Sequence, residues 1–357
     1  MAAEKISCEK NKAYSSDKQR KQQENNKTQK QEMKIRTRST VYDFLCDNVH
    51  NEKIDNPYVI QFANNSLIRH YRTSFAQEWH SFLNKNTLKK EITECYGVVN
   101  LVLDMVQKLD DHQCERLRNA RQIFFFDMCS GKGYTSVVLH AMLPEWLRKK
   151  SKIIMLDKTT KMNLQHLEVL NGDVVFEHFC IWPERKDGTR KLMSDLERLM
   201  KKYTLASSGE TEGDQGEVLG ICIGVHLCIY LSEIFINVFN EMDSIVGMAL
   251  SPCCLHETDE NRGLNEMCKD TSICEDANIH GLSREVLQYM GWTLFLFSKI
   301  KTEVTSGSGL ETIPVLKRMT HDEHVMSDRN NFLVAYKQHQ TQQPKQRVES
   351  DDASNSK

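Results

Sequence analysis

The chain has 357 residues, of which 39% are hydrophobic and 27% charged, and its formal net charge is −2. This composition is typical of a globular protein with one large or two ordinary domains. No long apolar run is present and the first residues lack an apolar core, which argues against a transmembrane helix and a signal peptide. We therefore expect no membrane association and a cytoplasmic protein, with the nucleus as the alternative location. In either place its twelve cysteines would be free thiols.

Both ends of the chain are polar. Residues 1–40 hold eleven Lys/Arg against five Asp/Glu, a net charge of +6, so the remainder carries −8. Such segments bury too little apolar surface to fold alone, and we predict disordered tails over 1–40 and 338–357. The basic arm could contact RNA phosphates; a solvated tail without a partner is the alternative.

Residues 41–120 are predicted to form a helical N-terminal extension. Their apolar residues recur at helical spacing, which places them on helix faces that point into a core. The first stripe contains Ile68, Tyr71, Phe75, Trp79 and Phe82, and the second runs from Cys95 to Leu109.

Residues 121–337 show a different pattern, in which short apolar runs alternate with helical stretches. The runs are residues 123–126, 152–156, 174–181, 220–225, 244–250, 292–298 and 331–337. The helical stretches are 134–147, 158–170, 189–203, 231–242 and a region near 282–290. This alternation predicts a Rossmann-like α/β fold, with a parallel sheet covered by helices on both faces. We expect the last two runs to form an antiparallel pair at the edge.

A short loop with two glycines follows the first predicted strand. The strand ends at Asp127, and residues 128–133, MCSGKG, lead into a helix at about Tyr134. Glycines permit left-handed backbone and let a ligand approach, and ligands of open α/β sheets lie at such turns. The pattern D-x-C-x-G-x-G matches neither the dinucleotide motif G-x-G-x-x-G nor the phosphate-binding loop.

A second carboxylate ends the next predicted strand. Asp157 follows the run KIIML, 30 residues after Asp127. A carboxylate at this position can accept hydrogen bonds from the two ribose hydroxyls of an adenosine ligand. An ordinary helix-capping aspartate is the alternative.

Four motifs extend this interpretation. DMCSGKG (127–133), LDK (156–158), GVHLC (224–228) and SPCC (251–254) resemble those of a family of class I S-adenosylmethionine (SAM)-dependent methyltransferases. That family includes the eukaryotic tRNA ribose 2′-O-methyltransferases that act on the acceptor stem. The resemblance implies a seven-stranded methyltransferase sheet over 121–337, SAM as cofactor and an RNA substrate such as tRNA. Cys129 and Ile229 stand where the family usually has glycine.

The resemblance also implies the site residues. The expected cofactor-binding residues are Asp127, Cys129, Gly131, Lys132, Gly133, Asp157 and Ile181. The expected catalytic residues are His226, Cys253 and Cys254. His226 would be a general base, or a residue that bonds the local backbone and shapes the site. The two cysteines would line the pocket or act as nucleophiles; a zinc site with Cys268 and Cys274 is a weaker alternative, and we expect no metal.

Two other functions remain open at this stage. A methyltransferase-like binding or scaffold protein without activity would fit the two glycine replacements. A dinucleotide-dependent oxidoreductase would share the α/β fold but lacks the third glycine. The sequence predicts neither the atom that is methylated nor an oligomeric state.

Overall fold

The computed structural model describes residues 39–110, 116–180, 187–207, 216–228, 230–252, 284–306, 311–327 and 330–338. The chain divides into two compact units, residues 1–93 with 161–172 and residues 94–160 with 173–357. The second unit contains the whole sheet. Within the described residues, no helix is long and apolar enough to cross a membrane.

The first unit is built from short helices. They are α2 (Val41–His50), α3 (Pro57–Asn64), α4 (Ser66–Ser74), α5 (Ala76–Leu83) and the 3₁₀ helix η1 (Gln165–Leu170). Thr40 begins α2 with a capping box to Asp43, which satisfies backbone N–H groups that have no partner inside the helix. The first predicted stripe is not one helix face, because the chain breaks at Phe75, between α4 and α5.

The segment before η1 corrects a second expectation. Residues 158–170 were predicted as helical, but 159–164 have no helix and only η1 follows. Lys158, Thr159, Thr160 and Lys161 are exposed, so this stretch has no buried face to stabilise a helix. His166 is buried instead against the rings of Phe82 and Trp79 of the same unit.

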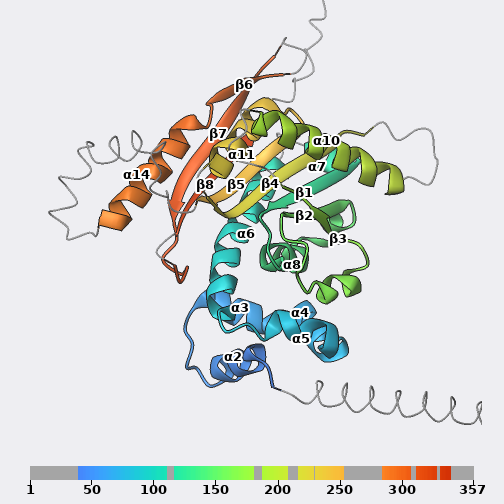
Figure 1. The fold of residues 1–357 in the computed structure, drawn as a ribbon, viewed down its shortest axis with the longest axis vertical. Coiled ribbons are helices and arrows are strands. Elements are labelled where there is room, and N and C mark those ends of the chain that lie inside the picture. The colour runs from blue at the N-terminus through green and yellow to red at the C-terminus, as the bar shows by residue number, and fades with distance from the viewer. Residues whose placement is uncertain are drawn as a thin grey trace, which may run out of the picture. The chain divides into compact units, whose positions relative to one another are not determined.

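The second unit confirms the predicted α/β class. The strands are β1 (Gln122–Met128), β2 (Ser151–Asp157), β3 (Val174–His178), β4 (Val218–Leu227), β5 (Ile245–Pro252), β6 (Glu303–Thr305), β7 (Thr312–His321) and β8 (Asn331–Lys337). Their order is β3-β2-β1-β4-β5-β8-β7-β6 (Figure 1). The first five pair in parallel, and β8, β7 and β6 add antiparallel partners. The described sheet thus has eight strands rather than seven.

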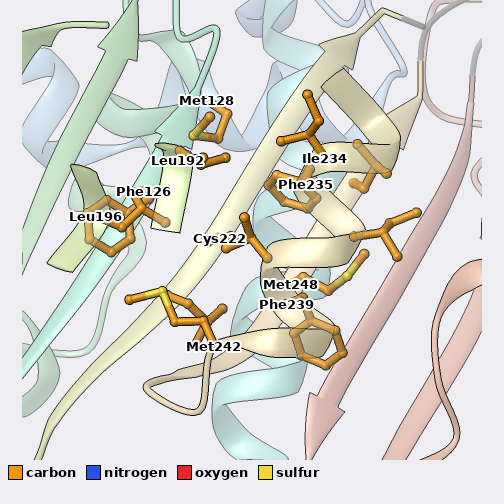
Figure 2. Packing of buried hydrophobic residues seen from close by; sticks show 14 of the residues in the cluster. Phe126, Met128, Leu192, Leu196, Cys222, Ile234, Phe235, Phe239, Met242 and Met248 are labelled. Atoms are coloured by element: carbon orange, nitrogen blue, oxygen red, sulfur yellow. The ribbon is translucent and has the colours of Figure 1, made fainter. Parts of the chain in front are cut away.

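Helices cover both faces of this sheet. They are α6 (Leu88–Asp110), α7 (Arg116–Asn119), α8 (Tyr134–Met142), α9 (Glu145–Arg148), α10 (Gly188–Ser207), α11 (Tyr230–Glu241) and α14 (Arg284–Lys299). On one face, α10, α11 and α14 form an apolar core with alternate residues of the strands. Figure 2 shows the part of this core in which residues of α10 and α11 pack against β1, β4 and β5. On the opposite face, Met105 of α6 lies against Gly247 of β5. Burial on both faces explains why β1 and β5 read as continuous apolar runs.

The outer part of the sheet corrects two further predictions. Residues 292–298, predicted as a strand, belong to α14, where Trp292, Leu296 and Ile300 recur at a spacing of four and are buried. Residues 312–321, which none of the predicted runs included, form β7. Only Ile313 and Val315 of that strand are well buried, so its alternation was too short to detect. β8 therefore pairs antiparallel with β5 and β7, and not with residues 292–298.

A buried lysine ends β8 and leads to a test. Lys337 is 1% exposed; its Nζ donates a 2.7 Å hydrogen bond to the carbonyl oxygen of Met242 and lies over the Phe239 ring. Burial lowers the pKa of Lys337 to about 8. The unfolded chain therefore binds more protons between pH 8 and the ordinary lysine pKa, and the cost of burying the charge falls as pH rises through that window.

We expect Lys337→Met to raise the free energy of unfolding at pH 7 by about 2 kcal/mol, since it removes a desolvated ammonium. This gain in the free energy of unfolding should fall to near zero by pH 10. Urea unfolding at both pH values measures the difference, with the exposed Lys201→Met as the matched control. A gain that does not change with pH would contradict this account.

Candidate functional site

The turn between β1 and α8 has the backbone that its glycines predict. Gly131 and Gly133 have φ values of 52° and 80°, and Gly133 begins α8 as its N-cap residue. Cys129 also has a positive φ, 56°, although left-handed backbone favours glycine. Cys129 therefore has a backbone conformation that a glycine at this position would adopt readily.

The two glycines of the turn have different surroundings. A Cβ atom on Gly133 would lie 2.6 Å from both Sδ and Cε of Met155, which is buried in β2. A Cβ atom on Gly131 would meet nothing within 4 Å. Gly133 is therefore required by packing, whereas Gly131 borders open space where a ligand can approach the backbone.

Asp127, at the end of β1, points into the protein. It is 1% exposed, and its Oδ2 accepts a 2.6 Å hydrogen bond from Ser136 Oγ, in the first turn of α8. Burial raises the pKa of Asp127 to about 7, although the hydrogen bonds from the Ser136 side chain and backbone act in the opposite direction. In this conformation Asp127 anchors the start of α8, and its contribution to cofactor binding would be through the shape of the turn.

Asp157, at the end of β2, holds the turn from the neighbouring strand. Its Oδ2 accepts a 3.0 Å hydrogen bond from the N–H of Gly131, and its Oδ1 accepts one of 2.7 Å from the N–H of Thr159. Each carboxylate oxygen has a second lone pair, so both can accept a further hydrogen bond. Asp157 and Lys132 are both only partly buried.

His226 lies at the end of β4, in a β-bulge. Val225 pairs with Ser251 and Leu227 with Pro252, so His226 is the extra residue, and its φ is 59°. Its Nε2 lies 3.0 Å from Oε2 of Glu94, a residue of α6. The His226 side chain is 33% exposed and that of Glu94 only 6%.

Register brings these strand ends to one edge of the sheet. Met128, the last residue of β1, is aligned with Leu156 of β2 and with Gly224 of β4. The glycine turn, Asp157 and the bulge at His226 all follow these positions directly. This is the edge at which open α/β sheets bind their ligands.

Three predicted site residues lie outside the described residues. They are Ile181, Cys253 and Cys254, together with Cys268 and Cys274 of the zinc alternative. Their roles stay predictions. Among the described residues, no group of three or more His, Cys, Asp or Glu could hold a metal ion.

Two residues of the site were not predicted, Glu94 and Ser136. A signal for Glu94 existed in the second helical stripe, because Glu94 precedes Val98 by four residues and so shares its buried face. A carboxylate on an apolar helix face needs a partner. Ser136 gave no such signal, since a serine in the first turn of a helix is ordinary.

Comparison with known proteins shows what part of this chain is similar to. Residues 89–261, just under half of the chain, match a family model described as a methyltransferase domain. The matched range includes the glycine turn, Asp157 and the His226 bulge. This part of the chain is therefore similar to methyltransferase domains, and the match together with the turn indicates S-adenosylmethionine as the cofactor. No curated protein matches the chain.

Two of the matching solved structures resemble this chain only distantly. The CurJ carbon methyltransferase is 11% identical with a TM-score of 0.35, and the match covers 84% of this chain and 66% of that chain. The plantazolicin methyltransferase BpumL, solved in complex with SAH, is 7% identical with a TM-score of 0.31 and covers 83% of this chain and 100% of that chain. Scores this low support no argument about substrate or mechanism.

The residues present fit an adenosyl ligand. Open space at Gly131 leaves room against the backbone of the turn, and both oxygens of Asp157 can accept hydrogen bonds from ribose hydroxyls. When bound, SAM supplies a methyl group activated by its sulfonium. A protein that uses SAM has to orient the acceptor and exclude water.

Proposed function

We propose that this protein transfers a methyl group from SAM to a hydroxyl group of an RNA, with tRNA as the first candidate. The observation that supports the proposal best is the juxtaposition at one sheet edge. The open glycine turn and Asp157 provide the cofactor side, and His226 provides a base two residues beyond Gly224. A hydroxyl acceptor needs such a base because its proton must leave during the transfer.

Charge supports RNA as the substrate class. The first forty residues carry a net charge of +6, and phosphate contacts by lysine and arginine supply most of the affinity for nucleic acid. Lys158 and Lys161, just beyond β2, are exposed and add positive charge after Asp157. The motifs SPCC and GVHLC, which resemble those of tRNA ribose methyltransferases, point in the same direction.

Incubation with radiolabelled SAM and fractionated cellular RNA, protein and small molecules tests the proposal. We expect label in RNA, and digestion to nucleosides should yield a ribose-methylated product. Label in the protein or small-molecule fraction would show that the acceptor belongs to that class and is not RNA. SAM binding by calorimetry without label in any fraction would favour a binding or scaffold protein instead.

The basic arm can be tested separately. Deletion of residues 1–38 removes the +6 charge and keeps Thr40, which caps α2. We expect unchanged affinity for SAM, at least tenfold weaker RNA binding at low salt and a shallower dependence of RNA affinity on salt. Calorimetry and filter binding at several salt concentrations measure the two affinities. Equal RNA binding by both proteins would exclude the arm from recognition.

A further inference from the structure

We propose that Glu94 is a positioning residue for His226: it fixes the imidazole so that Nδ1 takes the proton of the methyl acceptor. This inference rests on the proposed methyl transfer and extends it to a residue that the motifs do not contain. Nε2 of His226 lies 3.0 Å from Oε2 of Glu94. Within the described part of the chain, no group is hydrogen-bonded to Nδ1.

The β-bulge makes this contact possible. Cys222 of β4 points into the core formed with α10 and α11, and regular alternation would send the side chain of residue 226 to that same face. The extra residue and the left-handed backbone at His226 break the alternation. Bulges of this kind re-aim side chains beside active sites, and strained backbone of this kind collects at functional positions.

Hydrogen bonds hold the bulge in place. Sγ of Cys228 lies 3.5 Å from the carbonyl oxygen of His226, and Oγ of Ser232 donates a 2.7 Å bond to the carbonyl oxygen of Leu227. The conformation of His226 is therefore supported from both α11 and its own loop. A histidine held this way loses little freedom when an acceptor arrives.

Helix α6 brings Glu94 to the same place by close packing. A Cβ atom on Gly97, three residues after Glu94, would lie 2.8 Å from the ring of Phe332 in β8. Farther along the helix, a Cβ atom on Gly247 of β5 would lie 2.6 Å from Sδ of Met105. Only glycines at these two positions allow the helix so near the sheet, so the backbone that carries Glu94 has little room to move.

The geometry selects a tautomer. A buried carboxylate accepts hydrogen bonds and does not donate, so the proton of the neutral imidazole is on Nε2 and the lone pair is on Nδ1. In the transfer, the acceptor oxygen forms a bond to the methyl carbon, and the sulfur–carbon bond breaks with its electron pair on sulfur. The hydroxyl proton passes to Nδ1, and the carboxylate of Glu94 stabilises the resulting imidazolium. The imidazolium then releases the proton to water.

The first test is spectroscopic and needs no acceptor. In protein with ring-¹⁵N-labelled histidine, the His226 signals, identified by their loss in His226→Asn, should show Nε2 protonated and Nδ1 unprotonated at a pH where the ring is neutral. Glu94→Gln should give a mixture of tautomers, because an amide can donate as well as accept. The exposed Glu241→Gln should leave the spectrum unchanged.

The second test is kinetic. We expect Glu94→Gln to reduce methyl transfer to RNA by 10- to 100-fold with SAM affinity unchanged within twofold. His226→Asn should reduce transfer at least as much. Asparagine is chosen because it tolerates the left-handed backbone at this position. The double variant should be no slower than His226→Asn, because the two residues act as a unit.

The outcomes separate this inference from the proposed function. An active wild-type protein in which Glu94→Gln changes neither the tautomer nor transfer, or in which the two effects multiply, would overturn the role of Glu94 alone. A wild-type protein that transfers no methyl group would instead overturn the proposed function, and the role of Glu94 in transfer with it.

Discussion

Asp157→Ala is expected to weaken SAM binding by at least 100-fold. The substitution removes an anionic acceptor for two ribose hydroxyls, and charge-assisted hydrogen bonds contribute about 1.5–3 kcal/mol each. It also removes the 3.0 Å hydrogen bond that Asp157 accepts from the N–H of Gly131. The turn that would contact the ligand is then less well fixed. Isothermal titration calorimetry with SAM or its demethylated product measures the loss.

Asp157→Asn is the matched control, since asparagine keeps the size and one acceptor oxygen but removes the charge. Its affinity should fall between those of the wild type and Asp157→Ala. Both variants should unfold at urea concentrations close to that of the wild type, because Asp157 is only partly buried. Wild-type affinity in the alanine variant would show that the cofactor does not bind at this turn.

Gly133→Ala is expected to lower the free energy of unfolding by about 2–4 kcal/mol. An alanine at a φ of 80° is strained by about 1 kcal/mol or more. Its Cβ would also lie 2.6 Å from the end of the buried Met155 side chain, and overpacking of a core costs about 1–3 kcal/mol. Urea denaturation followed by circular dichroism measures the change.

Two further variants divide this loss into its causes. In a Met155→Ala background the contact is gone, so Gly133→Ala should cost only the backbone strain. Gly131→Ala, with φ of 52° and open space at its Cβ, should cost about 1 kcal/mol yet weaken SAM binding. Equal destabilisation by both glycine substitutions would contradict the packing at Gly133.

The central part of the sheet could be predicted from the sequence for a physical reason. Parallel strands are buried on both faces, so β1 and β2 appear as unbroken apolar runs that end in Asp127 and Asp157. The glycine turn could be predicted because Gly131 and Gly133 are needed for left-handed backbone.

The remaining features depend on contacts that are distant in sequence. Residues 292–298 are apolar enough for a strand, and only packing of Trp292 and Leu296 against the core of the sheet selects a helix. The contact between Glu94 and His226 joins residues on different elements through a bulge, which no local pattern in β4 reveals. The hydrogen bond from Ser136 to Asp127 was likewise not visible in the sequence, and the role of Asp127 toward the cofactor stays a prediction.

The excursion of the chain between β2 and β3 affects how this protein can be dissected. Residues 161–172 leave the sheet-containing unit, contribute the buried His166 to the aromatic cluster with Trp79 and Phe82, and then return to form β3. A truncation at residue 93 would strip the helices from this segment and leave His166 and Leu170 without the apolar surroundings that bury them. The helical unit therefore consists of two separate stretches of chain, and a single cut after residue 93 would leave residues 161–172 attached to the sheet-containing unit.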